Sequence, residues 1–316
     1  AGAETTAAAA PDRAAAVKAA DAVAARHGIR KSDKRAKAAA AALGTDESNF
    51  GDLTGDGKAD LAAIDRSGTL YVYPGKAYAW DGTGTRSKSL FASRIKVGTG
   101  WGKFTSLVRH GDFNVDGRQD VLTRDSSGRL FFYAGTGNPA GMFAKGTQAG
   151  TGWGGFTSIT GGGDLNGDGF DDLLGQKKTG ELVLYYGTGN PTTPFRAKGT
   201  VIGTGWKGSL LTSVGDWTGD TRTEWFFRNA AGTLYSYDSK AGTFPIGTRR
   251  EIIPAPDGFI LKNMVGMGNL TSDTAYVETP DLIWQLTDGT LLLVAPDTGP
   301  DFDVEIGTGW AGYRLF

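Results

Sequence analysis

The chain has no cysteine and only two histidines in 316 residues. Without cysteine it can form neither disulfides nor thiolate metal sites. His27 and His110 lie in no recognisable catalytic motif, and the sequence contains no G-x-S-x-G. A nucleophile with a neighbouring base is therefore not apparent, and the sequence predicts a protein that is not an enzyme.

The sequence also lacks a strong charge of either sign and any long apolar run. The formal net charge is −1, so no overall field favours nucleic acid or anionic membranes as partners. No stretch approaches the length of a transmembrane helix, so we expect no membrane insertion. Glycine, by contrast, is abundant at 50 residues, as expected when many tight turns join short strands.

Three segments share a nine-residue acidic pattern. They read D-L-T-G-D-G-K-A-D (52–60), D-F-N-V-D-G-R-Q-D (112–120) and D-L-N-G-D-G-F-D-D (164–172). Oxygen atoms at positions 1, 3, 5 and 9, with the backbone carbonyl of position 7, suit a hard cation such as calcium. The glycine at position 6 permits the sharp turn that such a loop requires. Because position 12 is Ala63, Thr123 or Gly175 rather than glutamate, the loops are not EF-hands.

The acidic pattern predicts three well-formed calcium sites and two weaker ones. The well-formed sites are Asp52, Thr54, Asp56, Lys58 and Asp60; Asp112, Asn114, Asp116, Arg118 and Asp120; and Asp164, Asn166, Asp168, Phe170 and Asp172. The weaker ones are a fourth copy without the glycine, Asp216, Thr218, Asp220, Arg222 and Glu224, and a fifth with a four-residue insertion, Asn269, Thr271, Asp273 and Asp281. The alternative is an ordinary Asp/Asn/Gly turn on a solvated face.

The spacing of the loops predicts the architecture. Their first residues lie 60, 52, 52 and 53 positions apart, at Asp52, Asp112, Asp164, Asp216 and Asn269. A period near fifty with several strands per repeat is typical of propeller blades. A second strand follows each loop, and most of these strands are apolar on both faces, as expected between neighbouring blades. They are 70–73, 130–133, 182–185, 234–237 and 291–294. We therefore expect an all-β, five-bladed β-propeller over residues 45–316.

A second motif, Gly-Thr-Gly-Trp, repeats out of phase with the loops at 98–101, 150–153, 203–206 and 307–310. No copy precedes the first loop, and no loop follows the last copy. Residues 307–316 should therefore close the ring as the strand that blade one lacks, by pairing with the strand that leads into Asp52. We interpret Trp101, Trp153, Trp206 and Trp310 as packing anchors between blades. The alternative is a ring of platforms on which sugars stack.

The three intact copies resemble the FG-GAP or VCBS repeats of integrin-like β-propellers, over roughly residues 45–316. The resemblance implies structural calcium, bound by the acidic residues of the loops. Blade four departs from the family pattern at Thr221 and Glu224, and blade five departs further. Bacterial members are often secreted, alone or fused to hydrolases, and some relatives are lectins, so the resemblance fixes no ligand.

Residues 1–44 differ from the repeats. They contain 20 alanines, with eight Lys or Arg against four Asp or Glu. Pro11 suits the first turn of a helix and Gly28 its end. We expect a short, solvated, Ala-rich helical extension, because alanine buries little area; a spacer, a pro-segment remnant or an arm that docks on the propeller are alternatives. The sequence begins without methionine, as expected after removal of a signal peptide.

These observations favour a secreted, calcium-stabilised binding module, expected to be a monomer. Calcium loops suit the calcium-rich space outside the cell. Blade one carries extra residues at 76–85, and Tyr78 and Trp80 in this insertion are typical of a binding surface. Lectin-like recognition of a glycan or cell-wall polysaccharide is the first hypothesis. Binding of an extracellular protein, in adhesion or control of a secreted hydrolase, is the second, and a glycosidase or lyase is the third.

Overall fold

The structure is a computed structural model, and it describes residues 50–76, 90–215, 223–237, 249–253, 261–267, 281–294 and 303–316. In these residues the regular elements are β-strands and single-turn 3-10 helices. The predicted helical extension and the aromatic residues Tyr78 and Trp80 lie outside the described residues. In the part of the chain that the structure describes, no helix is long and apolar enough to cross a membrane.

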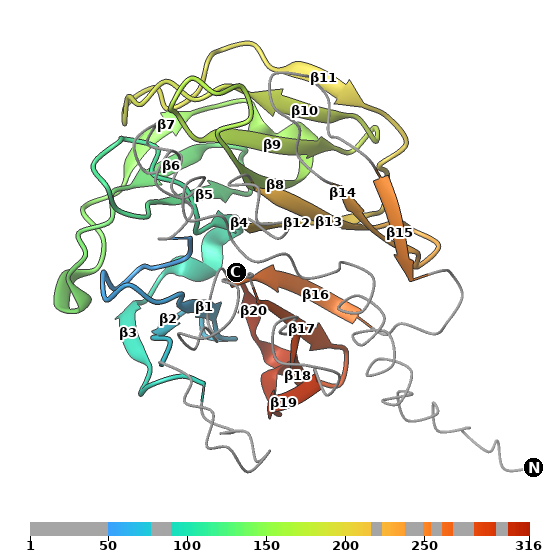
Figure 1. Ribbon diagram of the computed structural model, residues 1–316. Helices are drawn as coiled ribbons and strands as arrows, with labels where there is room; N and C mark the ends of the chain where they lie inside the picture. Colours follow the sequence, from blue (N-terminus) through green and yellow to red (C-terminus); the bar gives the residue numbers. More distant parts are fainter. Residues whose placement is uncertain are drawn as a thin grey trace, which may run out of the picture.

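The strands form five four-stranded antiparallel sheets, arranged as blades round a common centre (Figure 1). From the inner strand outward, blade one consists of β20 (Arg314–Leu315), β1 (Leu61–Ile64), β2 (Leu70–Tyr73) and β3 (Ile95–Gly98). Blade two consists of β4 (Phe104–Val108), β5 (Val121–Asp125), β6 (Leu130–Tyr133) and β7 (Thr147–Gly150). Blade three consists of β8 (Phe156–Gly163), β9 (Asp172–Lys177), β10 (Leu182–Tyr185) and β11 (Thr200–Gly203).

Blade four consists of β12 (Leu210–Gly215), β13 (Glu224–Arg228), β14 (Leu234–Tyr237) and β15 (Arg249–Ile253). Blade five consists of β16 (Leu261–Gly266), β17 (Leu282–Leu286), β18 (Leu291–Val294) and β19 (Asp303–Gly307). The predicted all-β fold of five blades is therefore confirmed. The strands predicted after the polar turns are β2, β6, β10, β14 and β18, with the predicted bounds.

The C-terminal strand closes the ring, as predicted, but with a different partner. Strand β20 pairs with β1, which follows the first acidic loop, and Leu315 lies opposite Ala63. Two hydrogen bonds between Phe316 and Ala62, of 2.9 and 3.3 Å, extend the pairing. The expectation of pairing with a strand that leads into Asp52 was wrong. The end of the chain occupies the inner position that β4, β8, β12 and β16 occupy in the other blades, so the new partner is the second strand (Figure 1).

Each Gly-Thr-Gly-Trp motif contacts a glycine in the turn that precedes a third strand, at the boundary between two blades. Trp101 begins a 3-10 turn after the first Gly-Thr-Gly, and its backbone N donates to Gly68 O in the turn before β2 (2.9 Å). The same bond recurs at the three other Gly-Thr-Gly-Trp copies. Gly128 in the corresponding turn has a φ of 76°, and a Cβ there would collide with the backbone of Gly154. Only glycine fits this close approach.

Polar side chains at one position of the second strand also join blades two, three and five to the blade that follows each of them. Arg124 in β5 donates to the carbonyl oxygens of Trp153 (3.3 Å) and Phe156 (2.6 Å). In blade one this position is Ile64, and Arg314 of β20 supplies the contact instead. The other pairs are Gln176 with Trp206 O, Gln285 with Trp310 O (2.7 Å) and Arg314 with Phe104 O (2.5 Å). The carbonyl oxygens of Trp153 and Trp310 also accept a backbone N–H, so the side chains add a second hydrogen bond to each.

Candidate functional site

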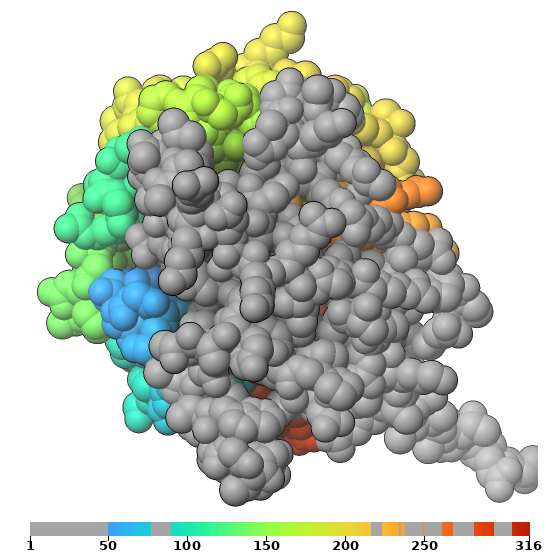
Figure 2. Space-filling model, in the orientation of Figure 1, coloured from blue at the N-terminus to red at the C-terminus, as the bar shows by residue number. Residues whose placement is uncertain are grey.

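Each of the three intact acidic loops leads into the second strand of its blade, and in blades two and three it starts from the inner strand. Residues 112–120 lie between β4 and β5, residues 164–172 run from β8 into β9, and residues 52–60 lead into β1. This shared connection places the loops at the same end of the ring. On the face shown in Figure 2, the blue start of the described chain reaches the surface beside the green of blade two.

The aspartate at position 1 holds the turn of each loop. Asp112 accepts hydrogen bonds from the backbone N–H groups of Asp116 (2.9 Å) and Gly117 (2.6 Å), one on each carboxylate oxygen. Asp52 accepts from Gly55 and Gly57, and Asp164 accepts from Gly167, Asp168 and Gly169. A carboxylate that accepts several N–H groups acts as the organising centre of an Asx-type turn.

The aspartate at position 9 is fully buried in each intact loop. Asp60, Asp120 and Asp172 each accept a hydrogen bond on Oδ1 from a backbone N–H after the third strand, at Gly75 (3.0 Å), Gly135 (2.9 Å) and Gly187 (2.8 Å). Burial raises the pKa of Asp60 to about 6, of Asp172 to about 7 and of Asp120 to about 8, and the carboxylates at positions 1 and 5 raise it further.

The side chain at position 8, which was not among the predicted site residues of the intact loops, connects neighbouring loops. Asp171 Oδ2 accepts a hydrogen bond from Asp112 N in the preceding loop (2.6 Å). Gln119 Oε1 accepts from Gly111 N (3.0 Å) and also from Gly51 N (3.4 Å), directly before the first loop. The residue at position 8 differs in every loop, so no sequence pattern marks it. The three loops therefore form one hydrogen-bonded row.

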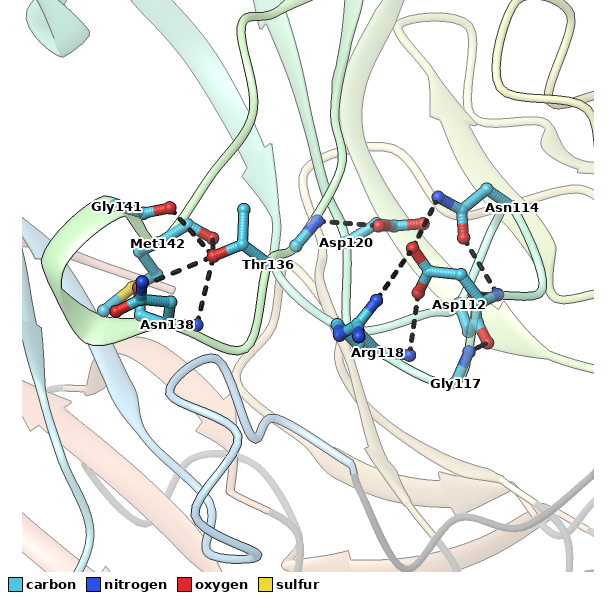
Figure 3. A network of polar contacts seen from close by, with 11 residues as sticks. Asp112, Asn114, Gly117, Arg118, Asp120, Thr136, Asn138, Gly141 and Met142 are labelled. Atoms are coloured by element: carbon cyan, nitrogen blue, oxygen red, sulfur yellow. Dashed lines mark hydrogen bonds and ion pairs between the residues drawn. The ribbon is translucent and has the colours of Figure 1, made fainter.

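The side chains at positions 3 and 5 lie at the tip of the loop (Figure 3). Asn114 accepts from Asp116 N (3.0 Å) and donates to Asp116 Oδ2 (3.1 Å). Arg118, at position 7, forms an exposed ion pair with Asp116 (3.7 Å). Asp120 lies behind these side chains, toward Thr136 (Figure 3). Exposed ion pairs contribute little to stability, so the tip is held mainly by bonds to the backbone.

The oxygen atoms of these loops fit a hard cation in chemistry. Thr54 Oγ1, at position 3, and Asp120 Oδ2, at position 9, are buried and have no partner at normal hydrogen-bond geometry among the described residues. Buried oxygen atoms of this kind are costly unless something binds them. Among the described residues, no group of three or more His, Cys, Asp or Glu side chains is arranged to hold a metal. A cation in one loop would therefore need amide, hydroxyl or carbonyl oxygens besides the carboxylates.

Of the two weaker loops, the structure describes only Thr223 and Glu224 of the fourth and Asp281 of the fifth. Asp216, Thr218, Asp220 and Arg222 of the fourth loop, and Asn269, Thr271 and Asp273 of the fifth, lie outside the described residues. Glu224 and Asp281 are buried, like the position-9 aspartates of the intact loops. A buried acid at this position is thus common to all five blades.

The repeated tryptophans lie between the blades. Trp101, Trp153 and Trp206 are only 9%, 7% and 6% exposed. Each packs against a tyrosine of the third strand, with ring centroids 4.9 Å apart for Tyr133 and 4.7 Å for Tyr185. The remaining contacts are Trp206 with Tyr237 (5.3 Å) and Trp310, which is partly exposed, with Tyr73 (5.0 Å). The three buried rings have little surface left for a sugar.

The inner strands of the five blades surround a cavity of about 220 Å³. Its lining comes from β4, β8, β12, β16 and the C-terminal residues Leu315 and Phe316, and the C-terminus lies at the centre of the ring (Figure 1). Eight of its 21 lining residues are serine or threonine. We call this cavity the central channel. Sequence reasoning did not identify it, because its lining residues are far apart along the chain.

Two charged or titratable side chains of blade two, Arg109 and His110, lie at the acidic-loop end of the central channel. Arg109 is 3% exposed and donates from Nη1 to Gly51 O (3.4 Å) and from Nη2 to Gly266 O in blade five. Burial lowers the pKa of Arg109 to about 10, and the nearby charge of Asp60 partly offsets this effect.

His110 reaches across the channel in another direction. Its Nε2 is hydrogen-bonded to Ser213 Oγ in β12, and its ring stacks on Phe50 with centroids 4.5 Å apart. Burial and the charge of Arg109 lower the pKa of His110 to about 3. A Cβ on Gly161 of β8 would collide with the imidazole. The sequence did contain a signal: blade three has glycine at both positions, where blade two has Arg109 and His110.

Comparison with known proteins identifies the repeats. The FG-GAP-like repeat family matches residues 52–123 and 112–175, which hold the three intact loops. Among solved structures, AofleA from Arthrobotrys oligospora is 10% identical, with 83% of this chain and 72% of that chain covered and a TM-score of 0.44. BBS1N in its complex with ARL6DN is 15% identical, with a TM-score of 0.34, and the match covers 74% of this chain but only 60% of that chain. No curated protein matches the sequence.

Proposed function

Because the chain is a β-propeller built on FG-GAP-like repeats, we propose that it is a secreted binding module that recognises a glycan on a calcium-stabilised scaffold. The observation that carries this proposal is the hydroxyl-rich central channel. Serine and threonine hydroxyls both donate and accept hydrogen bonds, as the hydroxyls of a sugar require. A concave site with several convergent polar groups is the usual form of a small-ligand site.

The size of the central channel limits what it can hold. A cavity of about 150 Å³ accommodates a benzene molecule, so the 220 Å³ here suit one small molecule and not a long oligosaccharide. The apolar side chains of Leu107, Ile159 and Met264 also line the channel and would contact the carbon face of a ring. We therefore place the end of a glycan, or a single sugar residue, in the channel.

Calcium would be held by positions 1, 3, 5 and 9 of the acidic loops and by the carbonyl of position 7. The unpartnered oxygens of Thr54 and Asp120 support this assignment. When bound, calcium would balance the carboxylates that otherwise repel one another, and favour the ionised form of Asp120. The row of bonds through Asp171 and Gln119 would then transmit this stabilisation from loop to loop.

Binding is a better proposal than catalysis for the described residues. The position-9 aspartates are buried and occupied with backbone N–H groups, so they are poorly placed as general acids. The structure does bring together a serine and a histidine, Ser213 and His110, which the sequence did not suggest. No carboxylate of the described residues orients His110, and Arg109 beside it disfavours the charged imidazole that a general base must form.

A glycan array probed with the full chain tests the proposal. Ser106 is buried in the channel lining, so Ser106→Phe should fill the channel and abolish glycan binding. The control is Ser126→Phe, because Ser126 is exposed in a turn outside the channel. Both variants should keep calcium-dependent melting. If Ser106→Phe binds glycans like the wild type, the channel is not the site. Capture of an extracellular protein with no glycan signal would favour the protein-binding alternative.

A further inference from the structure

The central channel contains a buried positive charge that forms no direct ion pair with a carboxylate of the described residues. Arg109 forms no ion pair with any described residue, and its contacts are Gly51 O, Gly266 O and Met267 Sδ (3.4 Å). Asp60 influences its charge from a distance, but the oxygens of Asp60 already accept backbone N–H groups. A guanidinium removed from water without a counter-charge is costly. An anion in the channel would remove that cost.

A second buried arginine shows what a purely structural role looks like. Arg124 bonds through all three of its nitrogens, from Nε to Thr105 Oγ1 (3.1 Å), from Nη1 to two carbonyls and from Nη2 to Thr157 O. Arg109, by contrast, uses only Nη1 and Nη2, and its Nε–H contacts no acceptor in the described part of the chain. Arg109 also lines the channel, whereas Arg124 lies between two blades. Arg109 therefore has donor capacity left for a ligand.

The side chains near Arg109 limit which chemical groups that ligand can carry. His110, the next residue, is bonded to Ser213 Oγ, which lies 3.3 Å from Thr160 Oγ1, so two hydroxyl groups of the channel lining lie next to each other. A ligand that satisfies both features carries a carboxylate for Arg109 and hydroxyls for the serine and threonine side chains. The 220 Å³ of the channel admit one such unit. Monosaccharides that carry a carboxylate, the uronic acids, combine these groups in the required size.

We propose that the central channel binds a uronic acid, free or at the end of a glycan, with its carboxylate against Arg109. This inference rests on the proposed glycan-binding function and specifies its ligand class. The carboxylate would supply the missing counter-charge, and Arg109 would position it without taking part in any reaction. Loss of a charge-assisted hydrogen bond in such a site should weaken binding about tenfold to a hundredfold.

Titration calorimetry on the calcium-loaded full chain tests the inference. The probes are D-glucuronate, D-galacturonate and D-mannuronate, the uncharged methyl ester of each, the corresponding neutral hexoses, and lactate as a carboxylate without a sugar ring. At least one uronate should bind, and its methyl ester and hexose should bind at least about tenfold more weakly. The ester comparison uses the wild-type protein and therefore does not depend on whether a variant folds.

Two variants complete the test. Arg109→Met should remove the preference for the acid over the ester, while Arg124→Met, which also loses a buried arginine, should keep it. Equal binding of acid and ester by the wild type would overturn the inference and leave the glycan proposal standing. Charge-dependent binding of lactate with no binding of any sugar would support the anion site and reject the glycan. No binding of any carboxylate at millimolar concentration would overturn the inference.

Discussion

Without calcium, the stability of this propeller should fall as the pH rises, which is the reverse of ordinary acid denaturation. Asp120 has an ordinary pKa of 3.8, and burial raises it to about 8 in the fold. Between these values the folded state holds a proton that the unfolded state has lost. The folded state therefore binds more protons, and the free energy of unfolding decreases with rising pH. The stability is fully present below pH 3.8 and is lost as the pH passes about 8.

The size of this effect is large for one residue. A pKa difference from 3.8 to about 8, at about 1.4 kcal/mol per pH unit, corresponds to about 6 kcal/mol. Domains are commonly stable by only about 5–15 kcal/mol. Asp60 and Asp172 change stability in the same direction, with pKa values of about 6 and 7. The calcium-free protein should therefore be close to unfolding at pH 8 and distinctly more stable at pH 5.

Asp120→Asn gives the sharpest form of the experiment. Asparagine is neutral like the protonated acid and keeps an oxygen for Gly135 N, and its amide would replace Asp120 Oδ2, which accepts no hydrogen bond of normal geometry although the Phe113 N–H is nearby. Urea unfolding in EDTA at pH 8 should show this variant to be more stable than the wild type. With calcium at pH 8 the order should reverse, because the ligand carboxylate is lost. Asp60→Asn is the control that should destabilise under both conditions, since its amide would face the N–H groups of Leu53 and Thr54.

Two outcomes would refute this reasoning. If the calcium-free wild type is equally stable at pH 5 and pH 8, the buried aspartates do not carry the raised pKa values on which the prediction depends. If calcium leaves the unfolding curve unchanged at pH 8, the loops do not bind the ion under these conditions.

Three further predictions follow from other parts of the chain. Val115 is exposed and has a φ of 60°, a conformation that favours glycine, and the first and third loops have Gly55 and Gly167 at this position. Val115→Gly should therefore raise the free energy of unfolding by about 0.5–1 kcal/mol, measured by urea unfolding. A loss of stability would contradict the argument that Val115 is strained. Deleting residues 307–316 removes β20 and exposes the inner edge of β1, so the protein should aggregate or melt early, whereas deleting residues 1–44 should have a much smaller effect. Tyr78→Ala combined with Trp80→Ala should leave glucuronate binding in the channel unchanged but weaken binding to a larger glycan or protein ligand; equal binding of that ligand would place it elsewhere.

Most of the architecture could be predicted because the same order of loop, strand, turn and strand recurs along the sequence. Third strands such as β2 and β6 were predicted with their observed bounds, since each is apolar on both faces and follows a turn glycine. Ring closure was also predictable from the unmatched last motif. The partner of the closing strand was not, because β20 is only two residues long and carries no pattern that distinguishes one edge from another.

The side-chain contacts of the loops were beyond prediction for a different reason. The bond from Asp112 N to Asp171 joins residues 59 positions apart, and the residue at position 8 changes from loop to loop. The calcium pattern marks positions 1, 3, 5 and 9 because the chemistry of the ion demands oxygen there. A bond between loops demands only some acceptor within reach, and alanine, glutamine and aspartate at position 8 share no signature.

In this fold, residues that recur in every blade have different roles from residues that occur in one blade only. The features that recur, such as the indole of Trp153 and the buried acid at position 9, all contact the neighbouring strand or blade, because every blade must solve the same packing problem. Arg109 and His110 occur in one blade only and replace two glycines of the next. Blade three forms its inner strand with glycines at these positions, so the strand itself does not require the two side chains. Arg109 and His110 bond to the other blades, and we attribute the remaining donor capacity of Arg109 to the proposed ligand, so in a repeat protein the residues that break the repeat are the ones to mutate first.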